Sequence, residues 1–383
     1  MSGLARVMLI DMPISRRGLL QAGGAAAVSL ATGNPALRDS PAVASQPQVQ
    51  RFHLGTYTAS GGRGIAHGFA DPSTGTPRID SWTALAQPSW LDLGPDSQHL
   101  YAISELSPAG TVNALTVGDG TAPAPLNTQP TGSGPAHVAV HPSGRFLFTS
   151  LYGGGAVVTH RILADGTVGA ATDTRRQSSG GRTSHAHQVV VDPAGEYVLA
   201  VDLGVDTVFT YELDVTGATL AEAGRLVLPT GSGPRHLAFH PNGAYAYTAD
   251  ELASTVTVCS YAAGTLTAGQ VTPTVRDPGV DNYPGEIAVS ADGRFVYVSN
   301  RGTDTVAVFA VTEGGARLTL VATPSCGGAW PRHLAIDATG TWLYVANERS
   351  GNLAWFPIDA TTGLPGPAAG SIDVAAVTQI RFG

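Results

Sequence analysis

The sequence contains no lysine, and all 21 of its basic residues are arginine. This absence excludes Schiff-base catalysis and lysine general bases, both of which need a primary amine. Charged residues of either sign make up only 13% of the chain, and the formal net charge is −8. The basic surface that binds nucleic-acid phosphates is therefore missing, and we expect no nucleic-acid partner.

Cysteine is also scarce, with only Cys259 and Cys326 in distant parts of the chain. Their separation excludes a CxxC-type metal site. Cys259 lies in a segment of alternating polarity, 255–261, which indicates a small core residue, while pairing of the two thiols is left open. No apolar run is long enough to span a bilayer, so we expect no permanent membrane anchor.

Glycine and proline are abundant, with 48 and 26 residues. Between them, segments with two short apolar strands joined by a turn recur about every 48 residues. This period is typical of a β-propeller with one blade per repeat. The six segments are 88–105, 135–152, 185–203, 234–251, 284–301 and 331–348. Their alignment places at equivalent positions Trp90, His137, His187, His236, Glu286 and His333.

The two ends of the repeat region complete each other. Residues 377–382 fit one further first strand, with Gln379 at the repeated position, and residues 51–58 fit a second strand with no first strand before it. Joined, they form a seventh blade, and such closure removes exposed sheet edges. We therefore predict an all-β, seven-bladed β-propeller over residues 51–383, closed by N- and C-terminal strands in one shared blade.

Residues 1–44 have a different character. Arg16 and Arg17 form a twin-arginine pattern within 15–21, a weakly apolar stretch follows, and Ala42-Val43-Ala44 offers a small-x-small cleavage site. This order predicts a signal peptide for the twin-arginine (Tat) route, recognised by the Tat export machinery through residues 15–21. Residues 45–50 are then a short linker, and we expect the protein in the periplasm or outside the cell.

Ionisable side chains gather at one predicted face of the propeller. Blade strands run as an antiparallel meander from the inside outward, so the entry to strand 1 and the exit from strand 2 lie on the same face. A pocket with convergent charged groups is the default candidate for a functional site. The residues concerned are His185, His187, Arg235, His236, Asp250, Glu251, Glu286, Asn300, Arg301, Arg332, His333, Glu348 and Arg349.

The repeated histidines also have a structural interpretation. His137, His236 and His333 share one repeat position, where each can donate a hydrogen bond to a neighbouring blade. His187 differs, because the chain has His185-Ala186-His187 where other repeats have proline, and this favours a functional role. Two histidines at i and i+2 of a strand point to one side, but no third ligand is spaced nearby, so no metal site is predicted.

Arg235 and Glu251 belong to one repeat, and antiparallel pairing of its strands should bring them together. Arg301 ends the second strand of the next blade and faces the same mouth. Two arginines and a carboxylate beside a histidine suit an anionic or carbonyl substrate, because Arg can fork onto a carboxylate or stabilise an oxyanion. His or Glu can deprotonate water. The simpler alternative is a surface ion pair between Arg235 and Glu251.

A series of short motifs runs through the repeats in a fixed order. They are Gly55-Thr56-Tyr57-Thr58, His185-Ala186-His187, Asp202-Leu203-Gly204-x-Asp206, Gly233-Pro234-Arg235-His236, Glu251 and Ser299-Asn300-Arg301-Gly302. In these motifs the chain resembles the seven-bladed lactonase family, which includes bacterial propeller-type 6-phosphogluconolactonases and fungal carboxymuconate-lactonizing enzymes. The resemblance covers residues 51–383 and keeps the order of the motifs. It implies a site at the channel mouth, with the family's His, Arg, Glu and second Arg falling on His187, Arg235, Glu251 and Arg301.

The leading hypothesis is an exported, lactonase-like hydrolase that opens a cyclic ester without a cofactor. His187 or Glu251 would be the general base, and Arg235 and Arg301 would hold the carbonyl oxygen or an anionic arm of a small lactone or sugar-derived substrate. Export puts 6-phosphogluconolactone in doubt, because that sugar phosphate is intracellular. The alternatives are a non-catalytic exported propeller that binds a ligand or cell-envelope partner, and a muconate-type cycloisomerase. Further substrate contacts are assigned to His185, His236, Glu286, Arg332 and His333.

Overall fold

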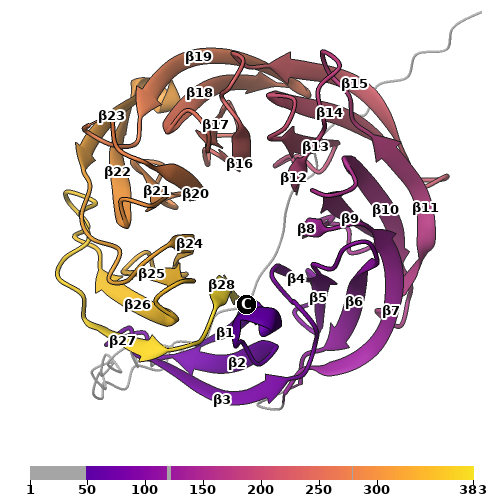
Figure 1. Ribbon diagram of the computed structural model, residues 1–383, viewed down its shortest axis with the longest axis horizontal. Coiled ribbons are helices and arrows are strands. Elements are labelled where there is room, and N and C mark those ends of the chain that lie inside the picture. The colour runs from indigo at the N-terminus through magenta and orange to yellow at the C-terminus, as the bar shows by residue number, and fades with distance from the viewer. Residues whose placement is uncertain (1–48, 119–121, 278) are drawn as a thin grey trace, which may run out of the picture. The chain divides into compact units, whose positions relative to one another are not determined.

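The computed structural model describes residues 49–383 except 119–121 and 278. Within this part of the chain the strands form seven four-stranded antiparallel sheets around one axis, as the blades of a propeller (Figure 1). The predicted all-β, seven-bladed fold is confirmed. The predicted signal peptide, 1–44, lies outside the described residues, as does most of the predicted linker. Among the described residues, no helix has the length and apolar character needed to cross a membrane.

Each blade is a meander whose first strand is nearest the axis (Figure 1). Blade 1 contains β28 (Val377–Phe382), β1 (Gln50–Thr56), β2 (Ile65–Ala70) and β3 (Pro77–Thr83). Blade 2 contains β4 (Leu91–Leu93), β5 (His99–Ser104), β6 (Gly110–Thr116) and β7 (Ala124–Gly132). Blade 3 contains β8 (Pro135–Val140), β9 (Phe146–Leu151), β10 (Ala156–Ile162) and β11 (Val168–Arg176). Blade 4 contains β12 (Ala186–Val191), β13 (Tyr197–Asp202), β14 (Thr207–Asp214) and β15 (Thr219–Val227).

The remaining three blades follow the same plan. Blade 5 contains β16 (Pro234–Phe239), β17 (Tyr245–Asp250), β18 (Thr255–Ala262) and β19 (Thr265–Pro273). Blade 6 contains β20 (Tyr283–Val289), β21 (Phe295–Arg301), β22 (Thr305–Thr312) and β23 (Arg317–Ala322). Blade 7 contains β24 (Pro331–Ile336), β25 (Trp342–Asn347), β26 (Asn352–Pro357) and β27 (Gly370–Asp373). Two short 3₁₀ helices, η1 (Thr58–Ser60) and η2 (Glu313–Gly315), lie in described connections.

Blade 1 is closed by the two ends of the repeat region, as the sequence predicts. The C-terminal strand β28 pairs antiparallel with β1, and Leu54 stands opposite Ile380. Both side chains are fully buried in one apolar cluster that also contains residues of blade 7. The two ends of the repeat region are therefore held by backbone pairing and by burial of apolar surface at the same place.

Tyrosines of the second strands fasten neighbouring blades together. Each of four buried tyrosines donates its hydroxyl hydrogen to a glycine carbonyl in an outer turn of the next blade. A buried hydroxyl needs such a partner, so these bonds fix the angle between adjacent sheets. They run from Tyr101 to Gly166 (3.0 Å), Tyr247 to Gly315 (2.9 Å), Tyr297 to Gly363 (2.7 Å) and Tyr344 to Gly75 (2.6 Å).

Several first strands begin with a β-bulge, in which one residue has no partner on the second strand. The bulges show that the repeat alignment made from the sequence needs a correction. In blade 5 Pro234 pairs with Asp250 and His236 with Ala249, so Arg235 is the extra residue. In blade 4 Ala186 pairs with Asp202 and Gln188 with Val201, so His187 is the extra residue. The alignment of His187 with His236 is therefore wrong by one position. Gln188 is the equivalent of His236, and His187 is the equivalent of Arg235.

Candidate active site

The bulges and the ends of the second strands build one rim of the propeller. The extra residue of each bulge, such as His187, Arg235 or Arg332, lies at the entry to a first strand. The residue that ends or follows a second strand stands beside it, because the two strands are antiparallel. Seven equivalent positions of this second kind hold Tyr57, Glu105, Tyr152, Leu203, Glu251, Arg301 and Glu348.

Glu251 joins two arginines from adjacent blades. Its Oε2 lies 2.6 Å from Arg301 Nη2 and 3.4 Å from Arg235 Nε. Arg301 also donates Nε–H to Tyr283 O at 2.9 Å and Nη2–H to Pro284 O at 3.0 Å. Both guanidinium groups are buried, whereas the Glu251 side chain is 19% exposed. The backbone contacts therefore fix the Arg301 guanidinium in place, next to the Glu251 carboxylate, which solvent can reach.

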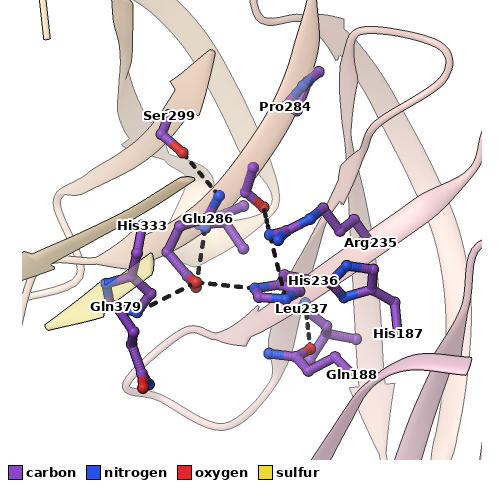
Figure 2. Close-up of polar contacts among 12 residues, drawn as sticks. His187, Gln188, Arg235, His236, Leu237, Pro284, Glu286, Ser299, His333 and Gln379 are labelled. Atoms are coloured by element: carbon purple, nitrogen blue, oxygen red, sulfur yellow. Dashed lines mark hydrogen bonds and ion pairs between the residues drawn. The ribbon is translucent and has the colours of Figure 1, made fainter. Parts of the chain in front are cut away.

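Arg235 is the most deeply buried of these groups. Its side chain is 1% exposed, and Nη1 donates to Gly285 O at 2.7 Å and lies 3.3 Å from His236 Nε2 (Figure 2). Burial, and then the charges of Arg301 and Arg332, lower the pKa of Arg235 to about 9. The guanidinium remains protonated at neutral pH. Its positive charge is only weakly shielded by water, so it acts strongly on an anionic group at the rim.

His187 lies between Arg235 and the rim of blade 3. Its ring packs 5.0 Å from the ring of His236 and 5.8 Å from that of Tyr152, and Figure 2 shows it beside Arg235. Burial, with the charges of Arg235, Arg332 and Arg301, holds the pKa of His187 well below its usual value of 6.5. Its Nδ1 is buried without a hydrogen-bond partner, while its Nε2 is not buried and makes no hydrogen bond to a described residue. His187 is therefore a neutral imidazole whose Nε2 can accept a proton.

His185 and Tyr152 form an aromatic wall next to His187. The two rings stack with centroids 4.5 Å apart, and His185 Nδ1 lies 3.0 Å from Tyr152 O. Tyr152 is 37% exposed, so its ring presents a face to solvent. Tyr152 was not among the residues predicted from the sequence, although it occupies the same repeat position as Glu251.

Arg332 forms a second charged group on the rim. Its Nη2 donates to Tyr57 Oη at 2.6 Å, and Tyr57 in turn donates to Glu105 Oε2 at 2.7 Å. Glu348 Oε2 lies 3.5 Å from Arg332 Nη1. Burial lowers the pKa of Arg332, but Tyr57, Glu105 and Glu348 more than compensate, so the net shift is upward. Tyr57 and Glu105 were not predicted as site residues from the sequence. They occupy the same position at the end of a second strand as Glu251, and this equivalence could have identified them.

Below the rim, a layer of side chains from the first strands packs together at the centre of the propeller, and we call it the floor layer. Its members occupy the position after the bulge, and inter-blade contacts link them (Figure 2). The Trp90 ring lies 4.3 Å from that of His137, 5.0 Å from that of His236 and 5.1 Å from that of His333. The floor layer consists of Trp90, His137, Gln188, His236, Glu286, His333 and Gln379.

Glu286 ties two histidines of the floor layer together. Its Oε2 lies 2.9 Å from His236 Nδ1 and 3.4 Å from His333 Nε2. Burial raises the pKa of Glu286 to about 8, with Arg235 opposing the shift, and burial lowers the pKa of His236. Of the five residues predicted to contact substrate, the structure thus places His185 and Arg332 on the rim. It places His236, Glu286 and His333 in the buried layer beneath.

The described residues contain no group of three or more His, Cys, Asp or Glu side chains placed to hold a metal ion. Cys259 and Cys326 are both buried, and their thiols are free. The groups available for chemistry at the rim are therefore arginines, carboxylates, imidazoles and phenols. Such a set can bind an anion or a carbonyl oxygen and move a proton.

Comparison with known proteins identifies the class. The family model described as "Lactonase, 7-bladed beta-propeller" matches residues 51–382, and the chain belongs to this family. A relative from Bacillus subtilis named 6-phosphogluconolactonase is 34% identical over 324 residues, which cover 81% of this chain and 92% of the relative. The family therefore supports a lactonase as the class of enzyme.

Solved structures agree with this assignment. A periplasmic gluconolactonase from Pseudomonas aeruginosa is 28% identical, with a TM-score of 0.83, over 88% of this chain and 99% of that one. A protein from Lactobacillus plantarum is 32% identical, with a TM-score of 0.82, over the same shares of the two chains. The likeness thus extends through the whole propeller.

Proposed function

We propose that this protein hydrolyses a small lactone at the rim formed by His187, Arg235, Glu251 and Arg301. The observation that carries the proposal is the meeting of two buried guanidinium groups at Glu251, beside the neutral imidazole of His187. Positive groups fixed in place before the reaction stabilise the negative charge that develops on a carbonyl oxygen.

The reaction follows from these groups. His187 takes a proton from water, and the water oxygen attacks the carbonyl carbon of the cyclic ester. The negative charge on the carbonyl oxygen of the tetrahedral intermediate is stabilised by Arg235 and Arg301. The ring C–O bond then breaks, the leaving alkoxide takes the proton from His187, and a hydroxy acid is released.

Glu251 has a positioning role in this scheme. Its carboxylate is the counter-charge of two guanidinium groups, whereas no carboxylate among the described residues pairs with His187. Glu251 also compensates two buried positive charges that would otherwise be costly. We therefore assign the base to His187 rather than to Glu251.

We further propose export by the Tat route and action on an unphosphorylated sugar-derived lactone. The twin-arginine leader supports export, and the relative from P. aeruginosa is described as a periplasmic gluconolactonase. Each rim arginine that a substrate phosphate would use already has a carboxylate nearby: Glu251 serves Arg235 and Arg301, and Glu348 serves Arg332. This pairing favours a neutral or singly charged substrate over a dianionic phosphate.

A panel of lactones tests the proposal. Glucono-δ-lactone, its 6-phosphate and a muconolactone would be hydrolysed with purified protein, His187→Gln and the control Arg317→Gln, which removes an exposed ion pair with Glu313. We expect turnover of glucono-δ-lactone that His187→Gln abolishes and Arg317→Gln preserves. Absence of turnover on every lactone would favour the non-catalytic binding propeller, and conversion of muconolactone alone, to a muconate rather than to a hydroxy acid, would favour the cycloisomerase.

A further inference from the structure

The side of the floor layer away from the rim opens into a cavity. Its volume is about 500 Å³, and it is lined by Trp90, His137 and His333 and by residues nearer the far ends of the first strands. The volume lies in the range that accommodates small organic ligands. The catalytic rim is on the other side of the floor layer, since it is built from the entries to these strands. The cavity is therefore a separate feature, and it does not depend on the proposed lactonase activity.

Small side chains at one repeat position create this space. Two residues after each member of the floor layer, most first strands carry alanine or valine instead of a bulky group. Short side chains near the axis leave the centre unfilled, while the floor layer fills it with rings. The small residues that line the cavity at this position are Ala139, Val190, Ala288 and Ala335.

The remaining two lining residues at that position are charged. Arg381 Nε lies 3.1 Å from Asp92 Oδ1, and Arg381 Nη1 donates to Phe382 O at 2.9 Å. Asp92 Oδ2 is already used, because it accepts the Val140 N–H at 2.8 Å. Arg381 is 41% exposed, and its Nη2 makes no hydrogen bond to any described residue. One edge of this guanidinium is thus available to an anion.

The floor of the cavity presents further unsatisfied polar groups. The His137 ring has one buried nitrogen without a partner, Nδ1, while its Nε2 is not buried and makes no hydrogen bond to a described residue. The indole N–H of Trp90 likewise makes no hydrogen bond within that part of the chain. His137 Nε2 and the Trp90 N–H can therefore bond to a polar atom of a ligand in the cavity.

We propose that the cavity is a binding site for a small organic acid with a flat apolar body. The carboxylate pairs with the free edge of Arg381, and the apolar body lies between the alanine and valine side chains and against Trp90. A hydroxyl or carbonyl group at the far end bonds to His137 or to the Trp90 indole. Arg381 and Asp92 stand two residues beyond the floor layer, about 7 Å along a strand. A hydroxylated benzoate has this chemistry, with a carboxylate and a hydroxyl on opposite sides of a flat ring.

Titration calorimetry with 4-hydroxybenzoate tests the site, with the uncharged 4-hydroxybenzamide as matched probe. We expect the carboxylate to bind at least about tenfold more tightly than the amide, because a charge-assisted contact is lost. Arg381→Gln should remove this preference and Arg381→Lys should retain part of it. Ala335→Phe should abolish binding of both probes by filling the cavity, and Arg317→Gln should change nothing. Thermal unfolding of each variant verifies that it is folded.

Three results would overturn the proposal. The first is no binding of 4-hydroxybenzoate to the unmodified protein. The second is binding that survives both Arg381→Gln and Ala335→Phe in folded protein. The third is binding that Arg301→Gln abolishes and Arg381→Gln does not, which would place the acid at the catalytic rim.

Discussion

Glu251 and Arg301 come from adjacent blades, and their Oε2 and Nη2 atoms meet at 2.6 Å. Glu251 follows β17 of blade 5, and Arg301 ends β21 of blade 6. Arg301 is also held by two backbone carbonyls of β20, so the geometry of this pair depends on the packing of the two blades. The candidate active site therefore forms only when neighbouring blades pack together, and no single blade contains it.

Replacing Arg301 tests the importance of this pair for catalysis. We expect Arg301→Gln to lower kcat/KM by about 10²- to 10³-fold, because one positive group that stabilises the oxyanion is lost. Arg301→Lys should recover only part of the rate, since an ammonium keeps the charge but not the planar fork. Steady-state kinetics with glucono-δ-lactone measures both values. Activity of Arg301→Gln within threefold of the unmodified protein would contradict the assignment.

The assignment of His187 as base predicts a particular pH profile. Burial and three nearby arginines hold the pKa of His187 well below 6.5, so the neutral form persists as the pH falls through that value. We expect kcat/KM, corrected for spontaneous hydrolysis, to stay level from pH 7.5 to 6.5 and to fall only at lower pH. His187→Gln should lower kcat by about 10²- to 10⁴-fold and abolish this acid limb. A half-maximal rate at pH 6.5 or above would show that His187 is not held neutral.

The fold could be predicted from the sequence because its signals are repeated. Two strands and a turn recur in six segments, and the C-terminal strand around Ile380 carries the same pattern as the other first strands. The position of His187 could not be predicted in the same way. A bulge adds one residue without disturbing the apolar pattern on either side, so only the pairing of Gln188 with Val201 reveals it.

The candidate site was predictable where strand direction decides it. Antiparallel pairing is enough to bring Arg235 to Glu251, and the structure shows both in contact. The sequence could not predict which side chains are buried in the floor layer. Glu286 and His333 belong to the same repeats as rim residues, and His333 is only one residue away from Arg332 on the rim. Side chains at this position either surround an open channel or pack against one another across it, depending on their sizes in all seven first strands. The Trp90 and His137 rings are large enough to pack together.

Export can be tested through the leader, which lies outside the described residues. Replacing both arginines of the pair, Arg16→Lys together with Arg17→Lys, should leave an unprocessed, larger protein inside the cell, because the Tat signal is read through this pair. Arg38→Lys changes an arginine of the same leader beyond the motif and should be processed normally. Cell fractionation with immunoblotting and N-terminal sequencing would follow the product, whose expected first residue is Ser45. Processing that is indifferent to the double change would contradict the prediction.

The floor layer makes a prediction about stability. Gln188 and Gln379 accept a backbone N–H from the next first strand, from Leu237 at 2.7 Å and from Leu91 at 2.6 Å. His333 Nδ1 faces the equivalent Ile380 N–H at 3.5 Å. Glutamine at position 333 can therefore make the same inter-blade bond, without a group that titrates near neutral pH.

Burial, followed by the charges of Arg235 and Arg381, lowers the pKa of His333 to about 3. The unfolded chain takes up a proton near pH 6.5 and the folded protein does not, so this residue's contribution to stability is complete above pH 6.5 and is lost as the pH falls toward 3. At pH 5 the loss is at most about 2 kcal/mol. Glu286 acts in the opposite direction, because its pKa is raised to about 8, and it is present in both proteins.

We therefore expect His333→Gln to match the unmodified protein in free energy of unfolding at pH 7.5 within about 1 kcal/mol, since the inter-blade bond is kept. At pH 5 the variant should be the more stable of the two by up to about 2 kcal/mol, because it has one fewer group to protonate on unfolding. Urea unfolding at both pH values measures the difference. An equal change of stability in the two proteins between pH 7.5 and 5 would mean that His333 takes up its proton at the same pH in the folded protein as in the unfolded chain, and would contradict the lowered pKa.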